Sequence, residues 1–128
     1  MSRIKGRNTG PELQVRSLVH RLGFRFSLRR TDLPGKPDIV LPRLQTVVFV
    51  HGCFWHRHRK CRNSTIPKTR REFWLRKLNS NVSRDRKNAV ALRALGWHVI
   101  VVWECELENE AKLRRKIIKA LKLFDASD

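Results

Sequence analysis

The stretch TVVFVHGCFWHRHRKC, residues 46–61, joins a run of apolar residues to a short segment crowded with histidine, cysteine and aromatic side chains. Its first part, Thr46 to His51, predicts a buried strand, because β-branched and aromatic residues follow one another in a short apolar run. Its second part shows no periodicity and should form a loop. Such a loop could hold zinc, supply catalytic groups or insert into another molecule, with separate residues serving each purpose.

The pattern around this strand predicts a mixed α/β fold. In NTGPELQVRSLVHRLG (8–23), apolar residues recur at helical spacing, Gly23 suits a helix end, and Thr9 with Glu12 resembles a capping box. The other expected elements are strands at Phe24–Leu28 and Asp38–Leu41, a helix at Arg70–Leu95, a strand at Trp97–Trp103 and a basic amphipathic helix at Glu108–Phe124. This order indicates a central sheet flanked by helices. A length of 128 residues suits one domain, which is expected to span residues 1–128.

The chain carries a large excess of positive charge. It has 29 Lys and Arg against 11 Asp and Glu, a net charge of +18 spread along its whole length. Nucleic acid is the expected partner, because each phosphate that is neutralised releases a condensed counterion. Membrane surfaces and acidic proteins fit less well, since the basic residues form no amphipathic tail. No apolar run has the length of a membrane span and no signal-peptide stretch is visible, so a cytoplasmic protein is expected.

Cysteines and histidines predict a metal site. Cys53 and Cys61 flank His56 and His58 in one loop, and Cys105 follows the last expected strand. An odd cysteine count without a secretory signal disfavours a disulfide framework, whereas structural zinc takes four Cys or His ligands. The three cysteines and one histidine meet that number, although the spacing leaves open which histidine binds. The alternative, free thiols beside a solvated loop, is credible for Cys105 alone.

Carboxylates suggest a second centre. Asp38 opens one strand and His51 ends the next, so the two side chains meet at one sheet edge if the strands pair. Hydrolysis of a phosphodiester by a metal enzyme needs oxygen ligands for Mg²⁺ and a group that activates water. Taken alone, Asp38 is also an ordinary turn residue. Asp85 interrupts the apolar stripe of the long helix, where a functional role or an ion pair would account for it. The capping position accounts for Glu12.

Two aromatic residues lie among the metal-ligand candidates. Phe54 and Trp55 stand in a polar loop, where a core role is difficult to arrange. Proteins that bend DNA insert apolar side chains between base steps. The two residues could therefore form a wedge, with Trp55 the better candidate, or they could pack around the zinc site.

Four segments together resemble the very short patch repair (Vsr) endonucleases. They are LPGKPDIV, VFVHGCFWH, EFWLRKLNSNVSRDRKN and LGWHVIVVWEC, and the similarity extends over residues 1–105. The resemblance implies a restriction-endonuclease-like fold with a zinc-binding loop. It also implies a bacterial enzyme that nicks double-stranded DNA beside T:G mismatches left by deaminated 5-methylcytosine.

The resemblance assigns roles to individual residues. Asp38 would bind the catalytic Mg²⁺ together with the main-chain carbonyl of Val50. His56 would be the general base, with His51 as a second catalytic histidine. Asp85 would orient a histidine. The rest of the implied set consists of Glu12 near the metal, Cys53, His58, Cys61 and Cys105 on zinc, Phe54 and Trp55 as the wedge, and Met1 opening the stack from the other groove.

Three functions are therefore weighed. The first is a Mg²⁺-dependent nicking endonuclease with structural zinc, expected to act as a monomer because the chain has one catalytic set and no dimerisation heptad. The second is a related nuclease without mismatch choice, used in phage defence or transposition. The third is a non-catalytic, zinc-stabilised DNA-binding module. Metal-dependent nicking separates the third from the others, and comparison of T:G with matched duplexes separates the first two.

Overall fold

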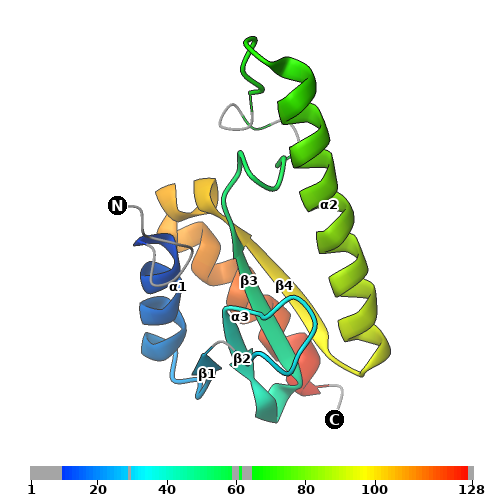
Figure 1. Cartoon of the computed structure of the whole chain (residues 1–128). Coiled ribbons are helices and arrows are strands. Elements are labelled where there is room, and N and C mark those ends of the chain that lie inside the picture. The colour runs from blue at the N-terminus through cyan, green and yellow to red at the C-terminus, as the bar shows by residue number, and fades with distance from the viewer. Residues whose placement is uncertain (1–9, 29, 59–60, 62–64, 127–128) are drawn as a thin grey trace.

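A computed structural model describes residues 10–28, 30–58, 61 and 65–126 (Figure 1). The elements follow the predicted order of helix, three strands, helix, strand and helix. In chain order they are α1 (Gly10–Arg21), β1 (Ser27–Leu28), β2 (Ile39–Leu41), η1 (Pro42–Leu44), β3 (Thr46–His51), α2 (Arg71–Ala94), β4 (His98–Trp103), η3 (Glu104–Glu108) and α3 (Glu110–Ala126). The two elements labelled η are short 3₁₀ helices.

The four strands form one mixed sheet in the order β1-β2-β3-β4. The first two pairings are antiparallel, whereas β3 and β4 are parallel and run in register from Thr46 opposite His98 to His51 opposite Trp103. Helix α2 lies between β3 and β4 in the chain and supplies the crossover that a parallel pair needs. The carboxyl ends of β3 and β4 therefore meet at one edge, and the segments that follow them start side by side.

Helices cover both faces of the sheet (Figure 1). On one face α1 and α3 pack against the sheet, and their shared core consists of Val15, Leu18, Val19, Ile39, Leu41, Val48, Ile100, Val102, Leu113, Ile117 and Leu121. On the other face the core is smaller and joins α2 to the sheet through Leu33, Val40, Val47 and Leu92. Successive buried side chains of β2 and β3 belong to opposite faces of the sheet, with Ile39, Leu41 and Val48 in the first core and Val40 and Val47 in the second, as strand geometry requires.

Two glycines end the helices that precede strands. Gly23 and Gly96 have φ of +89° and +93°, the left-handed region in which glycine carries no penalty. The amides of Phe24 and Trp97 donate to carbonyls five residues earlier, Val19 and Leu92, at 3.4 and 3.0 Å. This is the Schellman arrangement, and it confirms the helix ends predicted at both glycines.

The strand predicted at Phe24–Leu28 is shorter than expected. Among the described residues, Ser27 and Leu28 alone pair with β2, which is itself three residues long. Phe24 and Phe26 still pack against the core from irregular backbone, so the alternation indicated burial correctly but not strand pairing. The capping box expected at Thr9 lies outside the described residues. No helix in the described part of the chain is both long and apolar enough to span a lipid bilayer.

Leu92 fixes α2 against the sheet and gives a test of this packing. Leu92 is 0% exposed and Leu95, one turn later, is 60% exposed. We expect Leu92→Ala to lower the free energy of unfolding by about 2–5 kcal/mol, through lost burial and the cavity left behind. Leu95→Ala, the matched control, should change it by less than about 0.5 kcal/mol. Urea unfolding measures both, and equal losses would show that α2 does not depend on this contact.

Candidate active site and metal centre

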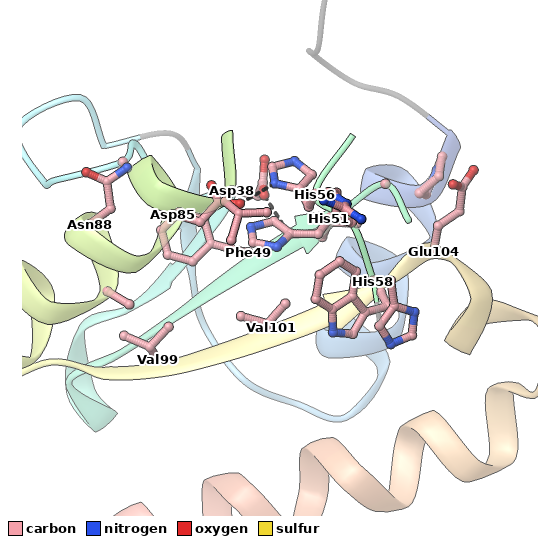
Figure 2. Close-up of a pocket in the computed structure, with 18 of the residues that line it drawn as sticks. Asp38, Phe49, His51, His56, His58, Asp85, Asn88, Val99, Val101 and Glu104 are labelled. Carbon is pink, nitrogen blue, oxygen red and sulfur yellow. Dashed lines mark hydrogen bonds and ion pairs between the residues drawn. The ribbon is translucent and has the colours of Figure 1, made fainter. Parts of the chain in front are cut away.

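A cleft of about 860 Å³ lies between α2 and the sheet, at the carboxyl ends of β3 and β4. Phe49, Val99 and Val101 form its apolar floor, and polar side chains from five segments stand at its mouth (Figure 2). All five side chains predicted as catalytic line this one cleft, namely Glu12, Asp38, His51, His56 and Asp85.

A short hydrogen bond in the cleft joins His56 and Asp85. His56 Nδ1 and Asp85 Oδ2 are 2.6 Å apart, which links the loop after β3 to the middle of α2 (Figure 2). Because a carboxylate accepts, His56 Nδ1 carries the proton in this pair and Nε2 is the basic nitrogen. Asp85 therefore contacts a histidine, as the family resemblance implies, and not the arginines beside it in sequence.

His51 lies directly against His56. The two imidazole rings stack with centroids 3.8 Å apart and planes 4° from parallel. Burial, followed by the nearby His56, lowers the pKa of His51 to about 4, so this ring is neutral near pH 7. Its Nδ1 is buried without a hydrogen-bond partner among the described residues. A buried, unpaired nitrogen is costly and marks a position where a bound species would be stabilised.

Asp38 immediately precedes β2 and lies beside the end of β3, because β2 and β3 pair in antiparallel fashion. Its Oδ2 accepts a hydrogen bond from the Val50 amide at 2.7 Å, which holds the carboxylate against the Val50 peptide. Glu12, from α1, is 4% exposed and accepts from Arg16 at 3.2 Å. Carboxylate and carbonyl oxygens are the ligands Mg²⁺ prefers, and this ion usually keeps several waters. The carboxylate of Asp38 and the main-chain carbonyl of Val50 are ligands of the kind that such a site needs.

Two further contacts hold the loop after β3 against α2. Arg57, in a left-handed conformation with φ of +52°, donates to Asn79 Oδ1 at 2.7 Å. Asn81 Nδ2 donates to the main-chain carbonyl of Trp55 at 3.1 Å. With the His56–Asp85 pair, three successive loop residues are bound to one helix, so α2 sets the position of the loop.

The second predicted cluster, Cys53, His58, Cys61 and Cys105, also comes together. The four ligand atoms all lie within 4.8 Å of one another. His58 Nδ1 is 3.6 Å from Cys53 Sγ and 3.4 Å from Cys105 Sγ. Ligand atoms on tetrahedral zinc are about 3.5 Å apart for a sulfur–nitrogen pair, so the cluster could hold zinc.

The thiols of this cluster favour a bound cation on electrostatic grounds. Burial and then the neighbouring thiol of Cys53 raise the pKa of Cys105 to about 12, and burial likewise raises the pKa of Cys53. A nearby positive charge would counter this effect and favour the thiolate forms of Cys53 and Cys105. A divalent metal supplies that charge and binds the thiolates directly.

Sequence reasoning missed Trp103 and Trp74. Trp103 stacks on His58 at 4.2 Å and meets the edge of His51 at 5.2 Å, so one indole touches both centres. Trp74, at the start of α2, lies 5.6 Å from Phe54 and 6.0 Å from Trp55 between ring centroids. The available signals were an aromatic residue two positions before Cys105 and the aromatic pair in EFWLRK, but neither indicates a partner.

Phe54, Trp55 and Trp74 form an aromatic cluster beyond the cleft, in which Phe54 and Trp74 are half-buried and Trp55 is exposed. Phe54 and Trp55 meet edge to face at 5.1 Å, and Trp55 is 47% exposed. The aromatic rings pack on one another and on Phe73, and not on the core of the sheet. Met1, the other residue assigned to opening the DNA stack, lies outside the described residues.

Comparison with known proteins shows the family to which the chain belongs. The family described as DNA mismatch endonuclease Vsr matches residues 1–63. A nicking enzyme of Xanthomonas oryzae pv. oryzae, V.XorIIP, is 51% identical over 89% of this chain and 86% of its own length. The DNA mismatch endonuclease Vsr of Escherichia coli is 44% identical over 88% of this chain and 72% of its own length. The chain belongs to the Vsr family.

Another relative extends the same conclusion. The nicking enzyme V.NmeAIP of Neisseria meningitidis is 46% identical over 91% of this chain and 83% of its own length. These matches confirm the family resemblance that the sequence motifs suggested, and the chain is a nuclease of the Vsr family with its mixed α/β, restriction-endonuclease-like fold. Individual residue roles, which no comparison tests, stay predictions.

Cys105→Ser tests the metal centre of this Vsr family member. The cluster joins the loop after β3 to η3, so metal bound there would stabilise the folded state. We expect the purified protein to contain one zinc per chain, and Cys105→Ser to lose zinc and about 3 kcal/mol of unfolding free energy. Elemental analysis and urea unfolding measure these effects. Glu108→Ser, an exposed substitution in the same 3₁₀ helix, is the control. A stable protein purified without zinc would exclude this role.

Proposed function

We propose that this protein is a DNA endonuclease that nicks one strand beside a T:G mismatch left by deamination of 5-methylcytosine. The observation that carries the proposal is the His56–Asp85 pair, 2.6 Å apart, at the mouth of a cleft that Asp38 also lines. The names of its relatives, mismatch endonuclease and nicking enzyme, support the reaction and the substrate. The net charge of +18 suits the polyanion.

His56 acts as the general base in this proposal. Asp85 accepts a hydrogen bond from the protonated Nδ1 of His56 and so leaves Nε2 free to take a proton from water. The water oxygen then attacks phosphorus, and the bond from phosphorus to the leaving ester oxygen breaks. Asp85 also stabilises the imidazolium that forms, as carboxylates paired with histidine do in other hydrolases.

The catalytic metal is assigned to Asp38 and the main-chain carbonyl of Val50. Bound there, Mg²⁺ would neutralise charge on the phosphate and lower the pKa of a water. The carboxylate of Asp38 is held next to the Val50 peptide by its 2.7 Å hydrogen bond, which supports this pairing of ligands. Neutral His51 stacks on His56 and keeps its ring in place without adding a competing charge. Glu12 borders the cleft from the side of α1.

Zinc at Cys53, His58, Cys61 and Cys105 would have a structural role. Closed sites with four Cys or His ligands leave no position for water or substrate. Cys53 and His58 flank Phe54, Trp55 and His56 in the chain, so a fixed metal would hold the intervening residues in place. Zinc is therefore assigned to rigidity of the loop and not to hydrolysis.

Phe54 and Trp55 of the aromatic cluster are the proposed wedge. A T:G wobble pair deforms more easily than a Watson–Crick pair, so the free energy needed to insert Phe54 and Trp55 is lower there. The difference is about the unstacking energy of one base step, a few kcal/mol at most. Trp55 precedes His56 directly, and the main chain of Trp55 is bound to Asn81 of α2. Insertion would thus place the neighbouring phosphate at the cleft. A monomer with one catalytic set in a single domain would cut one strand.

Asp38→Ala and His56→Ala test the assigned roles. Asp38→Ala should abolish Mg²⁺-dependent nicking while zinc content and DNA affinity stay close to those of the unchanged protein. His56→Ala should slow nicking by about 10²- to 10⁴-fold, the usual contribution of a general base. Single-turnover cleavage of an end-labelled T:G duplex measures both. Near-normal nicking by Asp38→Ala would place the metal elsewhere.

Trp55→Ala tests the wedge. We expect it to reduce the preference for T:G over matched duplex more than it reduces affinity for non-specific DNA, because the wedge acts only at a deformable step. Leu95→Ala removes an exposed apolar side chain at the far end of α2 and is the matched control.

Cleavage is compared on T:G and C:G duplexes with each strand labelled separately. Equal cutting of both duplexes by the unmutated protein would favour a nuclease without mismatch choice. Equal cutting of both strands would contradict nicking, and no metal-dependent cutting at all would favour a non-catalytic DNA-binding module.

A further inference from the structure

A second hollow adjoins the catalytic cleft along the outer side of His56 and Asp85. Its volume is about 550 Å³, and the described residues that line it are Leu33, Gly35, Lys36, His56, Asn81, Arg84, Asp85 and Asn88. Gly35, Lys36, His56, Asp85 and Asn88 line the cleft as well. We call this second hollow the side groove. A strand of nucleic acid lying in the cleft would continue into it.

The turn before β2 holds the backbone of Lys36 in place at the border of both hollows. Leu33 is buried in the core with Leu92 of α2. A Cβ on Gly35 would come within 3.0 Å of the Asn88 side chain, so this turn lies tight against the helix. The Lys36 amide donates to the Leu33 carbonyl at 3.1 Å, and Lys36 has a φ of +48°. A left-handed conformation is unfavourable for lysine and persists only where packing determines it.

Arg84 is the second cation of the side groove, and it is also held. Its guanidinium donates to Asn81 Oδ1. Asn81 in turn donates to the Trp55 carbonyl, which connects Arg84 to the loop that carries His56. Arg84 lies one helical turn before Asn88, next to Asp85. Lys36 and Arg84 therefore reach the groove from two segments that pack against each other, the turn before β2 and α2 itself.

The charge of the side groove suits a single anionic group. Lys36 and Arg84 are permanently positive near pH 7, and the only carboxylate among the described lining residues, Asp85, is bonded to His56. Lysine offers a compact charge and arginine a planar set of donors, and both are common ligands of phosphate oxygens. A phosphodiester group matches this combination in charge and in hydrogen-bond acceptors.

We propose that the side groove binds, through Lys36 and Arg84, a backbone phosphate next to the one that is cut. The inference rests on the proposed function in one respect, because it takes the cleft to hold the scissile phosphate. Phosphate contacts fix the register of a protein on DNA. Lys36 and Arg84 are thus positioning residues: they hold the strand so that the scissile phosphate lies against Asp38 and His56. Misplacement by about 1 Å can slow such a reaction about 100-fold.

The test removes the charge of Lys36 or Arg84 from the protein and, separately, the charge of one phosphate at a time from the DNA. Lys36→Gln and Arg84→Gln are compared with Lys87→Gln and Arg93→Gln, which remove the same charges from exposed positions on α2 outside both hollows. The substrates are T:G duplexes in which one phosphate at a time near the nick is an uncharged methylphosphonate. Equilibrium affinity, kcat and KM are measured for each pairing.

We expect Lys36→Gln to lower kcat/KM by about 10- to 100-fold, as loss of a hydrogen bond to a charged group predicts. One methylphosphonate beside the nick should impair the unmutated protein and both controls, yet have little further effect on Lys36→Gln or Arg84→Gln. Lys36→Arg, which keeps the charge, should restore most of the rate. Equal effects of Lys36→Gln and Lys87→Gln, or unchanged sensitivity of Lys36→Gln to every methylphosphonate, would overturn the proposal.

The binding measurements separate this proposal from the proposed function. If the unmutated protein does not nick T:G duplexes, the mismatch-nicking function fails. The phosphate site would still be supported if methylphosphonate substitution weakens DNA binding by the unmutated protein but not by Lys36→Gln or Arg84→Gln. If the substitution weakens binding by these variants as well, the phosphate site is overturned. The slope of log affinity against log salt provides a second readout, since losing one phosphate contact should reduce it by about 1.

Discussion

The parallel pairing of β3 with β4 determines the arrangement of both sites. Its register sets His51 opposite Trp103, so the loop after β3 and the 3₁₀ helix after β4 begin at neighbouring points on one sheet edge. An antiparallel pairing would have sent Cys105 to the opposite end of the sheet from Cys53. Parallel pairing also requires a long crossover. Helix α2 is that crossover, and its return across the sheet brings Asp85 to His56.

Much of this arrangement could be predicted from residue patterns, because the relevant signals are local. The apolar run at β3, the periodicity of α2 and the glycines that end two helices gave the order of elements and most of their bounds. The first strand could not be predicted in length, since the number of paired residues depends on β2. Phe24 and Phe26 alternate as a strand would, but tertiary packing alone buries them.

The residues of the candidate sites likewise divide into those that the sequence predicted and those that it did not. Residue types and family motifs identified Asp38, His51, His56 and Asp85 together, and the structure places them in one cleft. Trp103, Lys36 and Arg84 gave no such signal, because tryptophan in a strand and basic residues in a basic chain are unremarkable in sequence. Their contacts arise between elements distant in the chain. Only the packing of the turn before β2 on α2 brings Lys36 and Arg84 to one groove.

The Cys/His cluster also has a consequence for the order in which the chain folds. Cys53 and Cys105 are separated by 52 positions (105 − 53), and the segment between them contains all of α2. Forming β3–β4 contacts requires closing this long loop, and the entropy of closure opposes the step until many contacts exist. A metal that binds Cys53 at one end of this segment and Cys105 at the other would close the loop before β3 and β4 pair. The same ion would then shorten the search for the native topology as well as hold the finished site.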